Sequence, residues 1–135
     1  MLLYLSWKDS IGTHPDNKPY DFIVDLPKTV RLEGFWEVAL TDIKVKATKK
    51  TSFYLSIDFC EESIFKGSRY PVLRRVDDKI KQYAFPHFVR VNKSELQSIR
   101  VTLVEKNLNF FPASDIDCTL ILRRRNENSE RIPYS

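Results

Sequence analysis

One apolar run constrains this chain more than any other, the stretch Phe35–Val45. Trp36, Val38 and Leu40 fall on one side of an extended strand, because side chains alternate with a period of two. After Leu40 the apolar positions change parity, and the pattern resumes at Ile43. This change predicts a β-bulge or a sharp twist within one long central strand. We expect Trp36 to anchor the centre of the core.

Seven further segments have the alternation or the length of strands, with turn residues between them. They are Leu2–Trp7, Tyr20–Leu26 (ended by Pro27), Phe53–Cys60, Tyr70–Val76, Phe85–Val91, Ile99–Leu103 and Cys118–Leu122. Helical periodicity is limited to two short candidates, Glu61–Lys66 and Ser94–Gln97. Eight strands predict an all-β closed barrel or a two-sheet sandwich. The long connections favour Greek-key crossings, for which a jelly roll is the natural eight-stranded form.

The length of 135 residues fits one domain with a core of its own. We assign residues 1–125 to that domain and residues 126–135 to a polar C-terminal tail. A net charge of +4 is milder than the excess typical of proteins that live on nucleic acid alone. The sequence contains no apolar run of the roughly 18 residues that cross a bilayer. It opens with no signal-peptide pattern, so we expect a protein made inside a cell and not secreted by that route.

Residues that could carry chemistry are scattered along the sequence. His14 and His87 have no Cys or Glu at the spacing of a metal site. Three glycines leave no phosphate-binding loop. We therefore expect no catalytic site, no metal and no cofactor. Cys60 and Cys118 lie on opposite faces of their strands, which predicts two free thiols.

Two groups of basic residues form a candidate contact patch. They are Lys44, Lys46, Lys49 and Lys50 around one loop, and Arg123, Arg124 and Arg125 after the last strand. Two interpretations stay open. The groups are a solvated loop and an edge that repels unwanted strand pairing, or they contact nucleic acid phosphates or an acidic partner surface. No groove-reading helix or stacked aromatic side chain accompanies them, so we do not expect sequence-specific binding.

Three groups of motifs follow one another along residues 2–124. The first is His14-Pro15-Asp16-Asn17, Phe22–Pro27 and Leu32–Ile43; the second is Phe53–Asp58 and Tyr70–Val76; the third is Phe88–Val91, Ile99–Leu103 and Leu120–Arg124. In this order they resemble the minor capsid, or penton, single jelly-roll proteins of Polinton/Maverick-type elements and related double-stranded DNA viruses. Two departures are Lys44-Val45-Lys46-Ala47, where the family tends to have an aromatic–proline pair, and Asn107-Leu108-Asn109, where it tends to have glycine. Because Asn tolerates the left-handed region best after Gly, we expect that turn to survive.

The resemblance implies a single jelly-roll sandwich of two antiparallel four-stranded sheets. It also implies a structural role in the virion, at the five-fold vertices of a shell built from a larger major capsid protein. The expected partners are further copies in a homopentamer, the major capsid protein of the same element, and packaged DNA without sequence preference. No small-molecule substrate is expected. The adaptable contact segments are Asp9–Pro19, Glu61–Tyr70 and the tail.

Two other classes of function stay open. One is a lectin-like or cytokine-like jelly-roll module that recognises a sugar or a receptor, although such a module calls for a signal peptide and an exposed sugar site. The other is a nucleic-acid-binding protein, which rests only on the mild positive charge.

Overall fold

The computed structural model describes residues 1–125, which form eleven strands. One sheet has the order β1 (Leu2–Ser6), β11 (Asp115–Arg125), β3 (Phe35–Lys46) and β8 (Ile80–Gln82), with β9 (Val89–Arg90) also paired to β3. The second sheet has the order β2 (Asp21–Arg31), β10 (Glu95–Val104), β4 (Phe53–Ile57) and β7 (Val72–Val76). A separate hairpin joins β5 (Ser63–Phe65) to β6 (Ser68–Tyr70).

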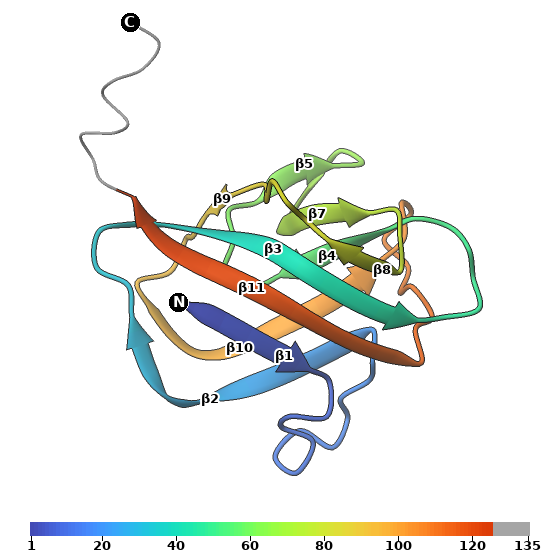
Figure 1. Cartoon of the computed structure of the whole chain (residues 1–135), viewed down its shortest axis with the longest axis horizontal. Coiled ribbons are helices and arrows are strands. Elements are labelled where there is room, and N and C mark those ends of the chain that lie inside the picture. Colours follow the sequence, from blue (N-terminus) through green and yellow to red (C-terminus); the bar gives the residue numbers. More distant parts are fainter. Residues whose placement is uncertain (126–135) are drawn as a thin grey trace, which may run out of the picture.

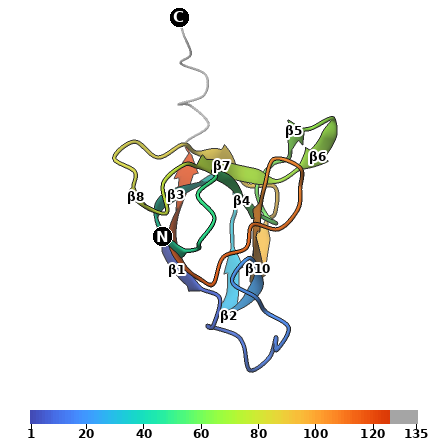
Figure 2. The same ribbon diagram turned by 90° about the vertical axis from the view of Figure 1, so that its right-hand side faces the viewer.

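The two main sheets are antiparallel and lie face to face as a β-sandwich, which confirms the all-β class (Figure 1, Figure 2). The inward side chains of both sheets form one continuous core. Its largest fully buried members are Phe22, Phe53, Phe59, Phe111, Leu40, Ile43, Leu55, Ile57, Leu96, Ile99, Leu103 and Ile116. Each such side chain stabilises the fold by about 1.5–3 kcal/mol relative to an exposed position.

The predicted bulge lies in β3 at Thr41. Leu40 pairs with Leu120 and Asp42 pairs with Thr119, so Thr41 is the extra residue in the ladder with β11. The Thr41 hydroxyl donates to the carbonyl of Thr119 at 3.1 Å, and its own carbonyl accepts the amide of Tyr83 at 2.8 Å. The backbone is therefore hydrogen-bonded despite the break in the ladder. The bulge keeps the inward face of β3 apolar on both sides of the parity change.

The first sheet has five strands where four were expected. The segment Phe85–Val91 contributes only the two residues of β9, and an unpredicted strand, β8, pairs with β3 beside it. All three residues of β8 are exposed, so no alternation marked it in the sequence.

Both predicted helices are wrong. Ser94–Gln97 opens β10, where Leu96 is buried opposite Val30 of β2. Glu61–Lys66 overlaps the β5–β6 hairpin, whose two-residue turn has positive φ at both Lys66 and Gly67. Segments this short contain too few apolar residues to distinguish the period of a helix from that of a strand. Residues 1–125 contain no helix that could span a membrane.

Pro27 does not end the second strand. β2 continues to Arg31, with a break in its ladder with β10 between the Asp25–Ser98 and Val30–Leu96 pairs. β2 lies at the edge of its sheet. A proline is tolerated at such an edge and at an irregularity, because its missing N–H breaks no central ladder.

Trp36 is not the centre of the core. It is half-buried and packs against the periphery of the core near the start of β3. Its indole Nε1 donates to the carbonyl of Glu33 at 2.9 Å. This polar group keeps one edge of the ring near the surface, and Val38 and Leu40 occupy the interior instead.

Candidate functional site

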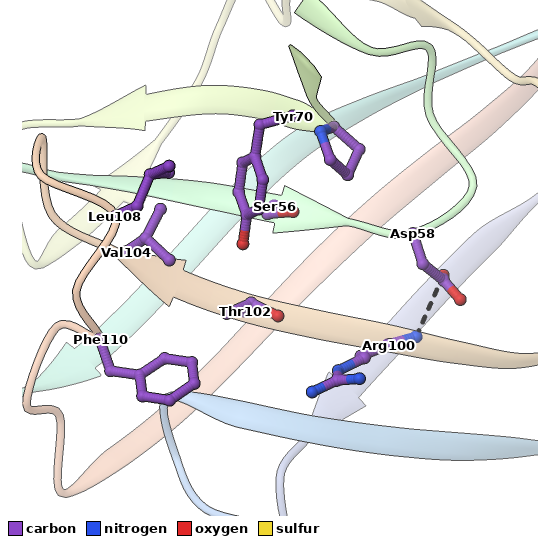
Figure 3. A pocket seen from close by; sticks show the side chains of 9 residues that line it. Ser56, Asp58, Tyr70, Arg100, Thr102, Val104, Leu108 and Phe110 are labelled. Atoms are coloured by element: carbon purple, nitrogen blue, oxygen red, sulfur yellow. Dashed lines mark hydrogen bonds between the residues drawn. The ribbon is translucent and has the colours of Figure 1, made fainter. Parts of the chain in front are cut away.

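A groove lies on the outer face of the second sheet (Figure 3). Its volume is about 410 Å³. The lining residues come from β4, β10, the end of the β5–β6 hairpin and the loop after β10, namely Ser56, Asp58, Tyr70, Pro71, Arg100, Thr102, Val104, Leu108 and Phe110. The β5–β6 hairpin and the loop after β10 both extend from the second sheet (Figure 2), and their side chains line the groove together with those of the sheet.

Aromatic contacts fix the hairpin wall. Phe65 of β5 packs edge-on against Tyr54 of β4, with ring centroids 4.7 Å apart. Tyr70 of β6 lies 6.4 Å from Phe65 on the side toward the groove. The Phe65–Tyr54 contact thereby holds the hairpin over β4, and the Phe65–Tyr70 contact and the ladder stabilise the hairpin itself.

The opposite wall depends on a strained turn. Leu108 has a φ of 68°, a conformation that bulky residues rarely adopt. The prediction that an asparagine would take this conformation is wrong; Asn107 instead accepts the amide of Asn109 at 3.0 Å with its side-chain oxygen. The turn brings Phe110 back beside Val104, and the centroid of its ring lies 5.1 Å from that of Tyr20.

The polar floor of the groove consists of paired charges. Arg100 makes two hydrogen bonds to the carboxylate of Asp21, at 2.9 and 2.8 Å, and this interaction raises the pKa of Arg100. Asp58 accepts the backbone amide of Arg100 at 3.1 Å and lies 3.5 Å from the Lys93 ammonium. Each charge is matched by its neighbour, so the floor is suited to binding polar groups and has no paired nucleophile and base.

The segment Asp9–Pro19 is fixed against β2 beside the groove. The buried side chain of Asn17 bonds both the amide and the carbonyl of Ile23, at 3.0 and 2.9 Å. Asp25 receives hydrogen bonds from His14 at 2.9 Å and from Thr13 at 2.8 Å, and these lower its pKa. His14 is therefore a structural partner of Asp25. In the sequence, Asn17 stood out only as part of the His14-Pro15-Asp16-Asn17 motif.

The lysines of the predicted basic patch surround the end of β3. Lys44 lies opposite Asp117 on β11, and Lys46 lies opposite Asp115. Lys49 donates to Glu105 at 2.6 and 2.8 Å. Lys50 is exposed in the following loop. Carboxylates thus face three of the four lysines, and we call this region the lysine end.

The arginines of the patch lie at the other end of the same strand pair. Arg125 pairs with Phe35 and Arg123 with Glu37, whereas Arg124 is opposite Trp36 and beside Gly34. The structure therefore separates the two groups by the length of β11. The patch is two sites, and we call the second the arginine end.

Both cysteines are free, as predicted. Both are also buried, and Cys60 lies beyond the end of β4 in the core instead of on the polar face of a strand. Burial raises the pKa of the Cys60 and Cys118 thiols to about 12. No cluster of three or more potential metal ligands occurs within the described residues. The predicted tail contact lies outside the described residues.

The groove residues Arg100, Tyr70 and Phe110 could not be recognised in the sequence. Arg100 and Tyr70 belong to strands and share their pattern with any solvated strand residue, and Phe110 lies in a loop. In comparisons with known proteins, no protein-family model and no curated protein matches the chain.

Proposed function

We propose that the protein is a structural subunit of a virus-like shell, a penton or minor capsid protein with a single jelly-roll fold that acts by assembling into a ring of five copies. Strand order carries this proposal. The orders β1-β11-β3-β8 and β2-β10-β4-β7 make the chain cross between sheets at most connections, as a jelly roll requires. The first and last strands are neighbours. The order of the capsid-like sequence motifs is a second, independent support.

Two apolar edges of the first sheet support head-to-tail association. β1 is one edge, has no charged residue or proline, and exposes 71% of Tyr4. The opposite edge exposes Ile80 on β8, and Phe85 in the next loop is 87% exposed. Exposed apolar strand edges invite pairing with another chain. A closed ring needs two different surfaces that fit each other, and these edges provide two.

A mixing experiment tests this assembly. Tyr4→Ser removes the apolar group from one edge, and Phe85→Ser removes it from the other. Because each variant keeps one intact edge, neither should close a ring alone, and an equimolar mixture should form dimers by light scattering. Ile64→Ser, on the β5–β6 hairpin and 74% exposed in the wild type, is the matched control and should assemble normally. Assembly by both edge variants would exclude these edges as the interface.

The remaining parts of the proposal follow from the same role. The partner beyond the ring is the major capsid protein of the same element, contacted by Asp9–Pro19 and Glu61–Tyr70, and the location is the virion. The Asp9–Pro19 segment has the fixed shape that such a contact needs, because Asn17 and Asp25 hold it. Purified shell particles should contain the chain at their vertices.

The groove favours a second candidate, a module that binds a sugar or a receptor. Tyr70 and Phe110 flank a floor of paired polar groups, and aromatic walls with a few oriented polar groups are typical of ligand pockets. A glycan array probed with wild type and with Tyr70→Ala tests it. Binding to one glycan class that the variant loses would favour the module over the capsid subunit.

A further inference from the structure

At the arginine end, Arg123, Glu37 and Arg90 lie side by side on three neighbouring strands, on the outer face of the first sheet. Glu37 of β3 pairs with Arg123 of β11 on one side and with Arg90 of β9 on the other. Arg125 projects from the same face two residues beyond Arg123, and its Nη1 lies 3.2 Å from the Glu37 carboxylate. Nη2 of Arg123 lies 3.6 Å from the other carboxylate oxygen. The sequence analysis had not linked Arg90 to this group.

Two phenylalanines hold the guanidinium groups in place. The Arg123 guanidinium carbon lies 3.4 Å from the centre of the Phe88 ring, and that of Arg90 lies 4.2 Å from the centre of the Phe35 ring. The N–H groups of a guanidinium lie in its plane. When the guanidinium stacks on an aromatic ring, these N–H groups can still donate hydrogen bonds to an anion. The stacking also orders long side chains that would otherwise lose rotamer freedom on binding.

The positive charges at this end outnumber the negative ones. Arg123 and Arg125 both contact the Glu37 carboxylate, whose side chain is 7% exposed, and Arg90 lies across the ladder from Glu37 without an ion pair to it. Among these four residues, three positive charges therefore face one negative charge. The side chains of Arg123 and Arg125 are 51% and 41% exposed. Within residues 1–125, the nearby carboxylates of Glu33 and Glu61 form no ion pair with these arginines. An anion from solution can therefore reach the surplus charge.

The spacing of the arginines suits a repeating anion. Arg123 and Arg125 are two residues apart along one strand, which is about 7 Å, and Arg90 is two strands away, which is about 10 Å. The single carboxylate of Glu37 contacts Arg123 and Arg125, and an anion with several charges is needed to engage Arg90 as well. Duplex DNA presents a negative charge about every 1.7 Å of its axis and could engage all three.

We propose that the arginine end binds the phosphodiester backbone of duplex DNA through Arg90, Arg123 and Arg125. The rings of Phe35 and Phe88 are already covered by guanidinium groups, so they do not stack on bases and binding has no sequence preference. The inference goes beyond ring assembly, because one subunit carries the whole site.

Fluorescence anisotropy with a labelled random-sequence duplex tests the proposal. We expect Arg123→Gln/Arg125→Gln to weaken binding about tenfold at 50 mM salt and to reduce the salt slope by about 2, since each lost phosphate contact removes about 0.9. The matched control is Lys44→Gln/Lys46→Gln, which removes two charges from the same strand pair but at positions facing Asp117 and Asp115. It should change the affinity less than about twofold. Equal losses in the two double variants would overturn the proposal.

Glu37→Gln separates DNA binding from a structural role. If the arginines only join β9 to β3, removing their carboxylate should leave DNA affinity unchanged or lower it. If they bind phosphate, the loss of the competing carboxylate should tighten binding about threefold and steepen the salt slope. Glu37→Gln also tests DNA binding if the double arginine variant fails to fold. An affinity that stays the same or falls would overturn the proposal.

Polyglutamate of matched charge is the competing probe. Displacement of the duplex by polyglutamate at the same charge concentration as unlabelled DNA would assign the site to an acidic protein and overturn the DNA proposal. These measurements use subunit concentrations at which light scattering finds monomers. A failure of DNA binding is thus distinguishable from a failure of ring assembly.

Discussion

The two ends of the β3–β11 ladder have similar charge in the sequence and opposite character in the structure. At the lysine end, Asp115 and Asp117 stand across the ladder from Lys46 and Lys44. At the arginine end, the single buried carboxylate of Glu37 pairs with Arg123 and Arg125, and Arg90 lies across the ladder from it. Carboxylates therefore stand opposite most of the lysines, whereas the three arginines share one carboxylate.

The difference shows that strand register, not local charge, decides what a basic run can do. A carboxylate directly across the ladder lowers the positive potential around a lysine, although exposed cross-strand charges of this kind contribute little to stability. Arginines that stack on rings stay ordered and keep free N–H groups. Four predictions test this contrast, from the largest expected effect to the smallest.

The largest loss of stability should come from a substitution in the middle of the β3–β11 ladder, between the lysine end and the arginine end. Leu40 is fully buried there, so Leu40→Ala should lower the free energy of unfolding by about 2–5 kcal/mol. Trp36 reports on the arginine end, and Trp7 reports on the lysine end through its 3.0 Å bond to Asp115. Urea unfolding can be followed by the fluorescence of each tryptophan in turn, with the other tryptophan replaced by Phe. Both signals should report the same loss of unfolding free energy. Unequal losses would mean that the two ends unfold separately.

A smaller effect should be confined to the arginine end. Gly34 has a φ of 91°, and a Cβ there would lie 2.9 Å from Nε of Arg124. Gly34→Ala should therefore cost about 1–3 kcal/mol of unfolding free energy. Gly12→Ala is the control, because nothing lies within 4 Å of the added carbon. A cost for Gly34→Ala no greater than for Gly12→Ala would show that the turn relaxes freely.

At the lysine end, the exposed pair between Lys49 and Glu105 should contribute little. Its 2.6 Å contact is short, but the lysine side chain is half-exposed, so Lys49→Ala should cost about 0.2–1 kcal/mol. Thermal unfolding at low and high salt measures this cost. A loss above about 2 kcal/mol that salt does not reduce would contradict a screened surface pair.

The smallest effect should come from making the lysine end resemble the arginine end. Asp117→Asn removes the carboxylate across from Lys44 and should tighten binding to duplex DNA about twofold, or about 0.4 kcal/mol. Anisotropy titrations at low salt detect such a change. A tenfold gain would mean that the lysine end, once uncovered, binds DNA as well as the arginine end does.

Several features of the fold could be predicted from local patterns. The parity change after Leu40 located the bulge at Thr41, because apolar side chains must keep facing the core. Short or exposed elements could not be found in this way. The three residues of β8 are all exposed, and the β5–β6 hairpin depends on a Lys66-Gly67 turn within a segment of helical composition.

The candidate sites were harder to predict, because they depend on contacts between distant segments. Arg90 and Arg123 are far apart in the sequence and meet only through the register of both strands with β3. Tyr70 and Phe110 likewise come from distant segments and line the same groove (Figure 3). Bulk alone suggested Trp36 as the core anchor, but its indole N–H requires a partner, and Glu33 provides one near the surface.

The mass of the full-length chain in solution tests the proposed assembly most directly. Light scattering across a concentration series should show the 15.9 kDa subunit giving way to a species of about 80 kDa, five copies in a closed ring. The larger species should appear without a ladder of higher multiples, since a closed ring has no free edge. A mass that stays at 15.9 kDa at every concentration, or that grows without limit, would contradict pentameric assembly.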